Sequence, residues 1–530
     1  MVGTALTRLC PPYELNLEKV KQEEMSNNNS PLSEDRIPVI VGVGEIADRP
    51  KDIAEGLEPM ALLEQAVRRA EADSGAKLLG ELGSLDVVNF LSWRYRDPEQ
   101  QLARRLGIKP AHLYYGPVGG ESPIRYLHEA AQRIARGECT VAAVCGAEAQ
   151  STATKAERAG VTPPWTPFAH DVEEPKRGAA FQKPLAVKLG VFRPVTVYPF
   201  YEVATSAHWG QTPREALAES GQLWSTYSAV AAENPNAWLK RRFTSDEITT
   251  PSPENRMIAW PYTKLMVANP TVNMGGAILM TSLAKARAAG IAEEQLIYPL
   301  GGASAEEPRD YLLRDQFYES HPQNAVLNAV MNLVGGDGQK FDAIELYSCF
   351  PCVPKMARRT LGLGPDVRPT VTGGLTFFGA PLNTYMTHAA CAMVRKLRAG
   401  AKLGLLYGQG GFVTKHHALV LSRQASQAPL AQDTSVQAEA DRNKRTVPDF
   451  VTQASGKGAI ESFTVIYGRG GEVEHGVVML RTKENARTLA RVPPRDDATL
   501  AHLFNMDRTP VGSSGDIVTG DDGVLEWRHR

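Results

Sequence analysis

Short apolar runs alternate with amphipathic segments over the first 150 residues. Residues 37–44 end in glycines, which is typical of a buried strand followed by a turn. Helical spacing of the apolar residues predicts a helix over 59–72. The same reasoning predicts strands at 87–91 and 140–146, and helices at 100–106 and 122–136. The alternation predicts a mixed or parallel sheet with helices on its faces.

The middle of the chain interrupts this rhythm, and the second half repeats it. Residues 150–255 are rich in proline and aromatic residues, so we expect an inserted subdomain there. The pattern then resumes with strands at 272–280, 343–346, 403–408 and 418–421, a glycine turn at 373–375 and a helix over 384–397. Each half has the order strand, glycine turn, helix, strand. This repeat predicts a duplicated α/β unit with its site between the halves.

The end of the chain has a different pattern. Strands are predicted at 462–467 and 476–480, joined by the Gly-rich turn 468–471, and residues 511–530 are expected to add edge strands. The predicted divisions are a flexible tail 1–36, a first half 37–285, a second half 286–425, a linker 426–450 without periodicity, and a small β-domain 451–530.

Composition excludes several classes of protein. Lys and Arg number 58 against 59 Asp and Glu, which argues against a nucleic-acid-binding protein. No apolar run approaches the roughly 20 residues that span a bilayer, and no secretory signal is present, so we expect a cytoplasmic protein without a membrane partner. The six cysteines are scattered. Cys349 and Cys352 form a lone C-x-x-C without a second ligand pair, so no metal site is predicted.

Four motifs, in order, carry a resemblance to a known family. Residues 345–350 (ELYSCF) resemble an E-L-H-D-C-F motif, and residues 373–383 resemble a G-G…G-H-P-x-G turn. Residues 255–266 and 272–277 resemble a proline-tryptophan segment and a D-G-A-A strand. Residues 37–425 thus resemble the thiolase superfamily, especially its sterol-carrier-protein-2-like branch. With the extra β-domain, the chain is similar to thiolase-like protein type 1.

The resemblance implies a fold and a ligand. The fold would be a duplicated thiolase fold of five layers (αβαβα) with an inserted loop subdomain and a C-terminal barrel similar to oligonucleotide/oligosaccharide-binding folds. The ligand or substrate would be a coenzyme A thioester of lipid metabolism, with no covalently bound cofactor. Thiolases commonly pair, so a homodimer is also implied.

The departures from the family concern its catalytic groups. Thiolases place a nucleophilic cysteine at a helix N-terminus, which lowers the pKa of the thiol. Here Gly120 stands at that position, and Ala380 stands for the histidine of G-H-P. Tyr347 replaces the motif histidine, and the last glycine-rich loop (406–411) has no cysteine. The sequence therefore predicts that no cysteine acyl-enzyme forms.

Three functions remain open: an acetyl-CoA acetyltransferase-like acyltransferase without a cysteine intermediate, a retro-aldol lyase of 3-hydroxyacyl-CoA, and a non-catalytic acyl-CoA binder or scaffold. Tyr347 and Tyr407 are candidate proton-transfer groups for the lyase, or packing residues. Asn383 is a candidate donor to a carbonyl oxygen, or a residue that shapes its turn. His388, like His416 and His417, is either a base or a satisfied core histidine.

The turn before the helix at 122 supplies further candidates. The backbone N–H groups of Gly119, Gly120 and Gly410 are candidates for binding a thioester oxygen. Ser122 is either a nucleophile or the N-cap before Pro123. Glu121 is either a base or a solvated loop carboxylate. The basic run Lys240, Arg241 and Arg242 is either a coenzyme A phosphate site or a solvated face.

Overall fold

The computed structural model describes residues 32–529 and contains two central sheets. The first sheet has five strands. Its strand order is β1-β7-β4-β2-β3. The bounds are β1 Pro38–Ala47, β2 Ser84–Val87, β3 His112–Tyr115, β4 Val141–Ala149 and β7 Asn273–Ser282. The inner strand β2 is parallel to β3 and β4, whereas β7 is antiparallel to both β1 and β4. The sheet is therefore mixed, as predicted.

The second sheet has four strands in the order β8-β11-β10-β9. Their bounds are β8 Tyr298–Glu306, β9 Ala343–Leu346, β10 Leu403–Gly410 and β11 Lys415–Ser422. The parallel pair β9 and β10 lies at one edge, and β11 runs antiparallel to β10 and β8. Apart from Leu403 and Lys415, every residue of β10 and β11 is buried, as expected for strands covered on both faces.

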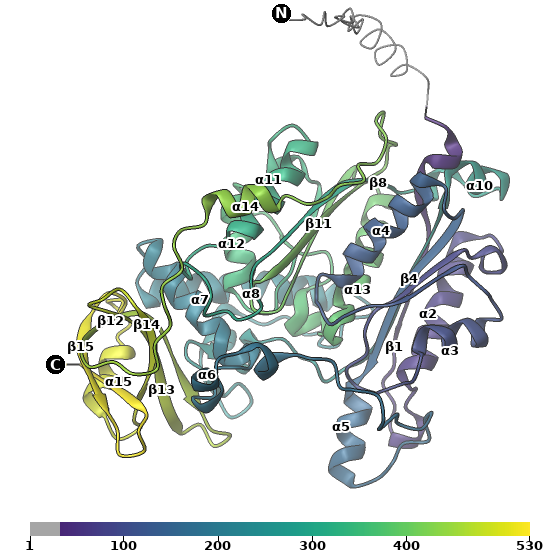
Figure 1. The fold of residues 1–530 in the computed structure, drawn as a ribbon. Helices are drawn as coiled ribbons and strands as arrows, with labels where there is room; N and C mark the ends of the chain where they lie inside the picture. The colour runs from purple at the N-terminus through teal and green to yellow at the C-terminus, as the bar shows by residue number, and fades with distance from the viewer. Residues whose placement is uncertain (1–31, 530) are drawn as a thin grey trace, which may run out of the picture.

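Two helices lie between the sheets, and others cover their outer faces (Figure 1). Helices α4 (Ser122–Arg136) and α13 (Tyr385–Arg398) each contact strands of both sheets, and they contact each other. Helices α2 (Pro59–Ser74) and α3 (Pro98–Leu106) cover the first sheet, and α11 (His321–Leu333) and α12 (Cys352–Thr360) cover the second. This arrangement confirms the five-layer duplicated fold.

The inserted segment connects β4 to β7 and is mainly helical. Its elements are α5 Gln150–Ala159, α6 Pro184–Lys188, α7 Pro194–His208, α8 Pro213–Glu233, α9 Ser245–Thr249, β5 Met257–Ala259 and β6 Tyr262–Thr263. Helix α7 is buried through almost its whole length, and it contacts both α12 and the C-terminal domain. The segment therefore joins the two thiolase-type halves to the C-terminal domain.

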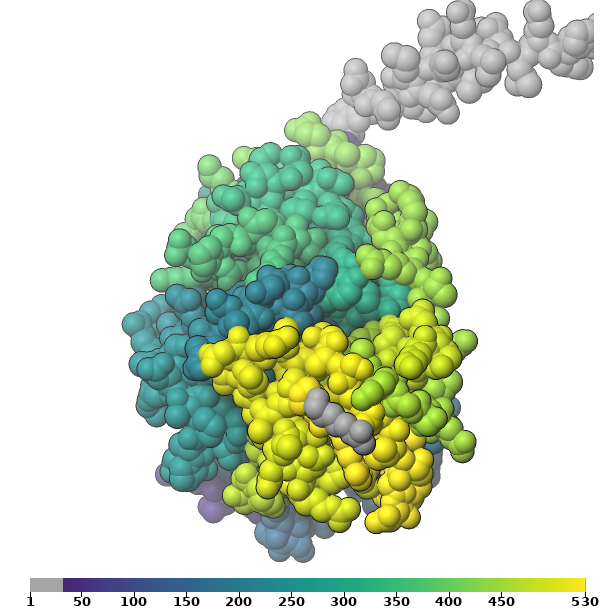
Figure 2. All heavy atoms as spheres, turned by 90° about the vertical axis from the view of Figure 1, so that its left-hand side faces the viewer, coloured from purple at the N-terminus to yellow at the C-terminus, as the bar shows by residue number. Residues whose placement is uncertain are grey.

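The C-terminal domain is a closed five-stranded barrel. Its strands are β12 Gly456–Tyr467, β13 Val473–Thr482, β14 Arg487–Val492, β15 Ser514–Thr519 and β16 Leu525–His529, with α15 Asp497–Leu503 between β14 and β15. The long strand β12 pairs with both β13 and β15, which closes the barrel. Figure 2 shows the yellow barrel lying against the blue and teal inserted segment.

The structure corrects several local predictions. The strand expected at 87–91 is β2 at Ser84–Val87, and the predicted edge strands in 511–530 are β15 and β16, which lie inside the closed barrel. Ser122 is not an N-cap: its hydroxyl reaches the Pro117 carbonyl at 3.4 Å, and Glu121 is the residue that precedes the helix.

Three segments add detail that the sequence did not predict. Helix α14 (Gln437–Asn443) lies within the predicted linker, and α10 (Leu283–Ala288) follows β7. Most of the predicted tail lies outside the described residues, although Glu34–Arg36 form a 3-10 turn. Between residues 32 and 529, no helix combines the length and apolarity needed to cross a membrane.

Candidate functional site

The turn before α4 leaves no room for a side chain at residue 120. A Cβ on Gly120 would overlap the hydroxyl of Tyr347 and would lie 2.8 Å from the Cζ of that ring. It would also lie 2.5 Å from the carbonyl oxygen of Gln409. Real Cβ atoms do not approach other atoms so closely. The phenol of Tyr347 therefore occupies the place where a nucleophilic side chain would begin.

Glu121 is a buried carboxylate in the same turn. It is 4% exposed, and its Oε1 lies 2.7 Å from the Lys415 ammonium, which also donates to the Val118 carbonyl at 2.8 Å. Its Oε2 is buried and makes no hydrogen bond within residues 32–529. A Cβ on Gly119 or Gly410 would overlap this carboxylate, so glycine at both positions makes space for it. The interpretation of Glu121 as a solvated loop residue is therefore wrong.

The backbone N–H groups of the turn have different partners. Gly119 donates to the Asn383 side-chain oxygen at 3.2 Å, and the Asn383 amide donates to the Asn89 carbonyl at 3.1 Å. The Gly119 N–H is thus engaged, whereas that of Gly120 has no acceptor within the described part of the chain. Buried N–H groups are rarely left unpaired, so the free donor beside a free carboxylate oxygen marks a candidate binding site.

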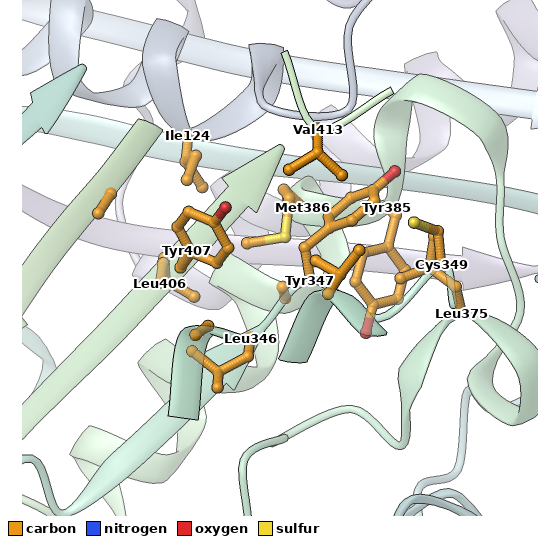
Figure 3. Close-up of a cluster of buried hydrophobic side chains, with 14 of the residues drawn as sticks. Ile124, Leu346, Tyr347, Cys349, Leu375, Tyr385, Met386, Leu406, Tyr407 and Val413 are labelled. Atoms are coloured by element: carbon orange, nitrogen blue, oxygen red, sulfur yellow. The ribbon is translucent and has the colours of Figure 1, made fainter. Parts of the chain in front are cut away.

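Tyr347 follows β9 and faces this turn. Its backbone N–H donates to the Tyr407 carbonyl at 3.0 Å, which aligns the end of β9 with β10. Figure 3 shows its ring in a buried cluster with Tyr385, Met386 and Val413. Burial, with the nearby Cys349 and Glu121, raises the pKa of Tyr347 well above its ordinary value. The phenol is therefore neutral and can donate a hydrogen bond.

Tyr407 does not share this site. Its hydroxyl accepts a hydrogen bond from Gln323 of α11 at 2.9 Å and lies 2.7 Å from His416 Nδ1. Successive residues of a strand face opposite sides, and Gly408 faces α4, so Tyr407 faces the outer helices. Burial lowers the pKa of His416 to about 3, which keeps this ring neutral. The prediction that both tyrosines face one cleft is therefore wrong for Tyr407.

The candidate histidines are all core residues. His388 faces the first sheet, where its Nδ1 lies 2.7 Å from Glu45 of β1, and Glu45 also pairs with Arg395. His417 contacts His128 of α4, with 3.2 Å between ring nitrogens. The proposed role of His388 at the cleft is not supported, because its ring is held on the other side of α13 from Gly408 and Met386.

The basic run at 240–242 is exposed and mostly neutralised. Arg241 pairs with Glu247, and Arg242 lies 2.6 Å from Glu233. The preceding residues Trp238 and Leu239 donate backbone hydrogen bonds to Phe378 and Phe377, both at 2.8 Å, so the run begins beside the turn that contains Ala380. Its role in binding coenzyme A stays a prediction.

The structure adds residues that sequence reasoning missed. Lys415 completes the site by pairing with Glu121, and no local pattern links the two. Glu345 accepts hydrogen bonds from Tyr385 at 2.6 Å and from the Val371 N–H at 2.8 Å. Burial raises the pKa of Glu345 to about 7 despite these donors. The sequence signal that could have identified Glu345 is its position as the one carboxylate within the apolar strand 343–346.

Comparisons with known proteins agree with this fold. The family model for the thiolase-like protein type 1 additional C-terminal domain matches residues 436–522. A monomeric SCP2-thiolase-like protein type 1 from Mycobacterium smegmatis has 26% identity and a TM-score of 0.77, covering 94% of this chain and 99% of its own. A search of curated proteins finds no match.

More distant structures share the fold alone. The Ltp2-ChsH2(DUF35) aldolase has 18% identity and a TM-score of 0.57, covering 74% of this chain and 98% of its own. Human mitochondrial 3-ketoacyl-CoA thiolase, solved in complex with CoA, has 15% identity and a TM-score of 0.54, covering 75% of this chain and 100% of its own. The five-layer core, the matched barrel and the likeness along nearly the whole chain together support the thiolase-like type 1 family of the thiolase superfamily as the family that this chain resembles.

Proposed function

We propose that this chain binds acyl-CoA thioesters at the N-terminus of α4 and acts on them without a covalent acyl-enzyme. The observation that carries this proposal is the Tyr347 hydroxyl in the space that a side chain at Gly120 would need. The similarity to a thiolase solved with CoA supports the choice of ligand. The site residues other than Lys415 are buried, so the proposal requires the site to open when the ligand binds.

Each free group has a place in this chemistry. The Gly120 N–H donates to the thioester carbonyl oxygen, which stabilises negative charge there. Glu121 Oε2 then removes a proton from the carbon next to that carbonyl, and an enolate forms. In direct acyl transfer, the enolate carbon attacks a second acyl-CoA. A carbon–carbon bond forms, and the coenzyme A thiolate leaves and takes the proton from Glu121.

A second candidate is retro-aldol cleavage of a 3-hydroxyacyl-CoA, which Tyr347 favours because its neutral phenol lies beside Gly120. Glu121 takes the proton of the substrate hydroxyl, the C2–C3 bond breaks, and a carbonyl product and a thioester enolate result. Tyr347 and the Gly120 N–H hold the enolate oxygen. The proton then returns from Glu121 to C2, so no cofactor is consumed. The similarity of this fold to that of the Ltp2-ChsH2(DUF35) aldolase supports retro-aldol cleavage as a candidate reaction.

Deuterium exchange at the thioester α-carbon tests the shared first step. Acetyl-CoA in D₂O is expected to gain deuterium with the wild-type protein, and Glu121→Gln is expected to lose at least about 100-fold of that rate, a typical general-base contribution. Glu129→Gln is the matched control, since Glu129 lies on α4 in a surface pair with Arg125 at 2.9 Å. Unchanged exchange in Glu121→Gln would overturn the base assignment.

Product analysis separates the alternatives. Intact-protein mass spectrometry after incubation with acetyl-CoA is expected to show no acyl adduct, and an adduct would contradict the proposal. Adding 3-hydroxyacyl-CoA distinguishes cleavage from transfer by its products. A rise in melting temperature with thioesters but without exchange or product would indicate a non-catalytic binder.

A further inference from the structure

A cavity of about 340 Å³ lies between α8 and α12, outside the site described above. Its volume is near the lower end of the range for small-molecule sites, roughly 300–1,000 Å³. Two arginines from the last turn of α12 line it, together with apolar and amide side chains. The lining residues are Gln211, Glu219, Gln222, Leu223, Thr226, Arg358, Arg359, Leu363, Pro365 and Val367.

The two arginines are in different electrostatic situations. Arg359 makes two contacts with Glu219, both at 3.0 Å, and its guanidinium lies 3.5 Å from the centre of the Trp209 ring. Arg358 has no carboxylate within 4.0 Å among the described residues. Its one hydrogen bond is from Nη2 to the Gly364 carbonyl, at 2.5 Å. Glu219 is paired with Arg359, and Glu219 and Asp366 act on Arg358 only from beyond 4.0 Å, so among the described residues Arg358 is the arginine of this lining without an ion pair.

The burial of Arg358 makes this charge unusual. Only 9% of the residue is exposed, and burial lowers the pKa of its guanidinium below the ordinary value. A guanidinium nevertheless stays charged in proteins. A basic residue in the last turn of a helix is favoured by the helix dipole, but this effect requires neither burial nor a cavity. A buried charge is expected to have a partner.

We propose that this cavity binds a small organic anion, whose phosphate or carboxylate group pairs with Arg358. The guanidinium offers a planar fork of N–H donors that matches either group. The apolar part of the ligand would pack against Leu223, Leu363 and Val367. Arg359 also lines the cavity, but its guanidinium is paired with Glu219. This site is separate from the thioester site and does not depend on its chemistry.

Binding of simple anions tests the proposal. The wild-type protein is titrated by calorimetry, and its melting temperature is measured, with phenyl phosphate, inorganic phosphate and hexanoate, each against sodium chloride at the same ionic strength. At least one probe is expected to bind and to raise the melting temperature. Phenyl phosphate binding over hexanoate would identify phosphate as the recognised group, and the reverse would identify carboxylate.

Variants of Arg358 make the test specific. Arg358→Gln is expected to weaken binding at least tenfold, and to leave the melting temperature of the free protein unchanged or higher, because a buried charge without an ion pair is removed. If that variant fails to fold, Arg358→Lys keeps the charge but loses the fork and is expected to bind several-fold more weakly. Arg214→Gln is the matched control, since Arg214 lies on α8 in an exposed pair with Asp507.

Two results would overturn the proposal: no probe stabilises the wild-type protein more than sodium chloride does, or the folded Arg358 variants bind as well as the wild type. Tyr347→Phe is expected to leave phosphate binding unchanged. The thioester proposal and the anion-site proposal can therefore fail independently, and the two assays distinguish these failures.

Discussion

The hydroxyl of Tyr347 lies too close to Gly120 for residue 120 to carry a Cβ. The two positions are far apart in sequence, and they meet because β9 pairs with β10, which contacts α4. A cysteine at residue 120 would require both the Tyr347 ring and the Gln409 carbonyl to move.

Gly120→Ala is expected to lower the free energy of unfolding by about 1–3 kcal/mol, because overpacking a filled site forces its neighbours to move. Tyr347→Phe removes the nearest of the overlapping atoms, so the double variant is expected to recover at least about 0.5 kcal/mol of that loss. Urea unfolding of the four proteins in the cycle measures this coupling. Gly80→Ala is the control, since a Cβ there meets nothing within 4 Å. If the changes in unfolding free energy of the two single variants simply add up in the double variant, the clash between residues 120 and 347 is contradicted.

Tyr407→Phe is expected to destabilise the protein without affecting α-carbon exchange. The change leaves Gln323 Nε2 and His416 Nδ1 without their partner in the core, which costs about 1–3 kcal/mol. Urea unfolding and the deuterium-exchange assay give the two readouts. A large loss of exchange in a variant that remains folded would show that Tyr407 reaches the substrate after all.

The pair His128–His417 is expected to make stability depend on pH. Burial lowers the pKa of His128 to about 4, and that of His417 lies well below its ordinary value. Unfolded histidines bind protons near pH 6.5, so the unfolded state binds more protons between about pH 6.5 and 4. Stability contributed by the pair is therefore lost as the pH falls through this window.

The comparison must be made against a variant, because Glu148 and Glu345 have pKa values raised to about 7 by burial and give the opposite slope between about pH 4.5 and 7. Unfolding of wild type and His128→Gln is measured from pH 7.5 to 4.5. The wild type is expected to lose more stability on acidification than the variant. Parallel curves would contradict the role of His128.

Lys355→Met is expected to destabilise the contact between α12 and the inserted helices. The Lys355 ammonium is fully buried, pairs with Glu202 of α7 and donates to Ser220 of α8 at 2.9 Å. Removing it leaves a buried carboxylate without a counter-charge, which costs about 3–5 kcal/mol. The double variant Lys355→Met/Glu202→Gln is expected to recover much of this loss in urea unfolding, and no recovery would contradict the explanation.

Local sequence patterns were enough to identify the elements that carry the site. The spacing around 122–136 predicted α4, and the resemblance to thiolases identified Gly120 as the position where their cysteine is absent. The orientation of Tyr407 could also have been predicted from the sequence. Strand alternation places Tyr407 opposite to Gly408 and Gly410, and the two glycines are the residues that allow close approach of α4.

Contacts between distant segments could not be predicted in this way. Glu121 looked like a loop carboxylate because its counter-charge, Lys415, is on the other half of the duplicated fold. The sequence analysis did not single out Arg358, and only the packing of α8 against α12 shows that it is buried without an ion pair. Such electrostatic environments depend on tertiary structure, whereas periodicity reports only local structure.

The strand pairing between the barrel and the inserted segment makes the added domain inseparable from the rest. Ile466 of β12 pairs with Ala259 of β5, and the buried Arg487 donates to the Leu312 carbonyl at 2.9 Å. Ser462 donates to the Phe200 carbonyl at 2.6 Å. A chain cut before β12 would leave these carbonyls and the edge of β5 bare. The barrel therefore shares strand pairing and buried hydrogen bonds with the rest of the chain, and we expect the two parts to unfold together.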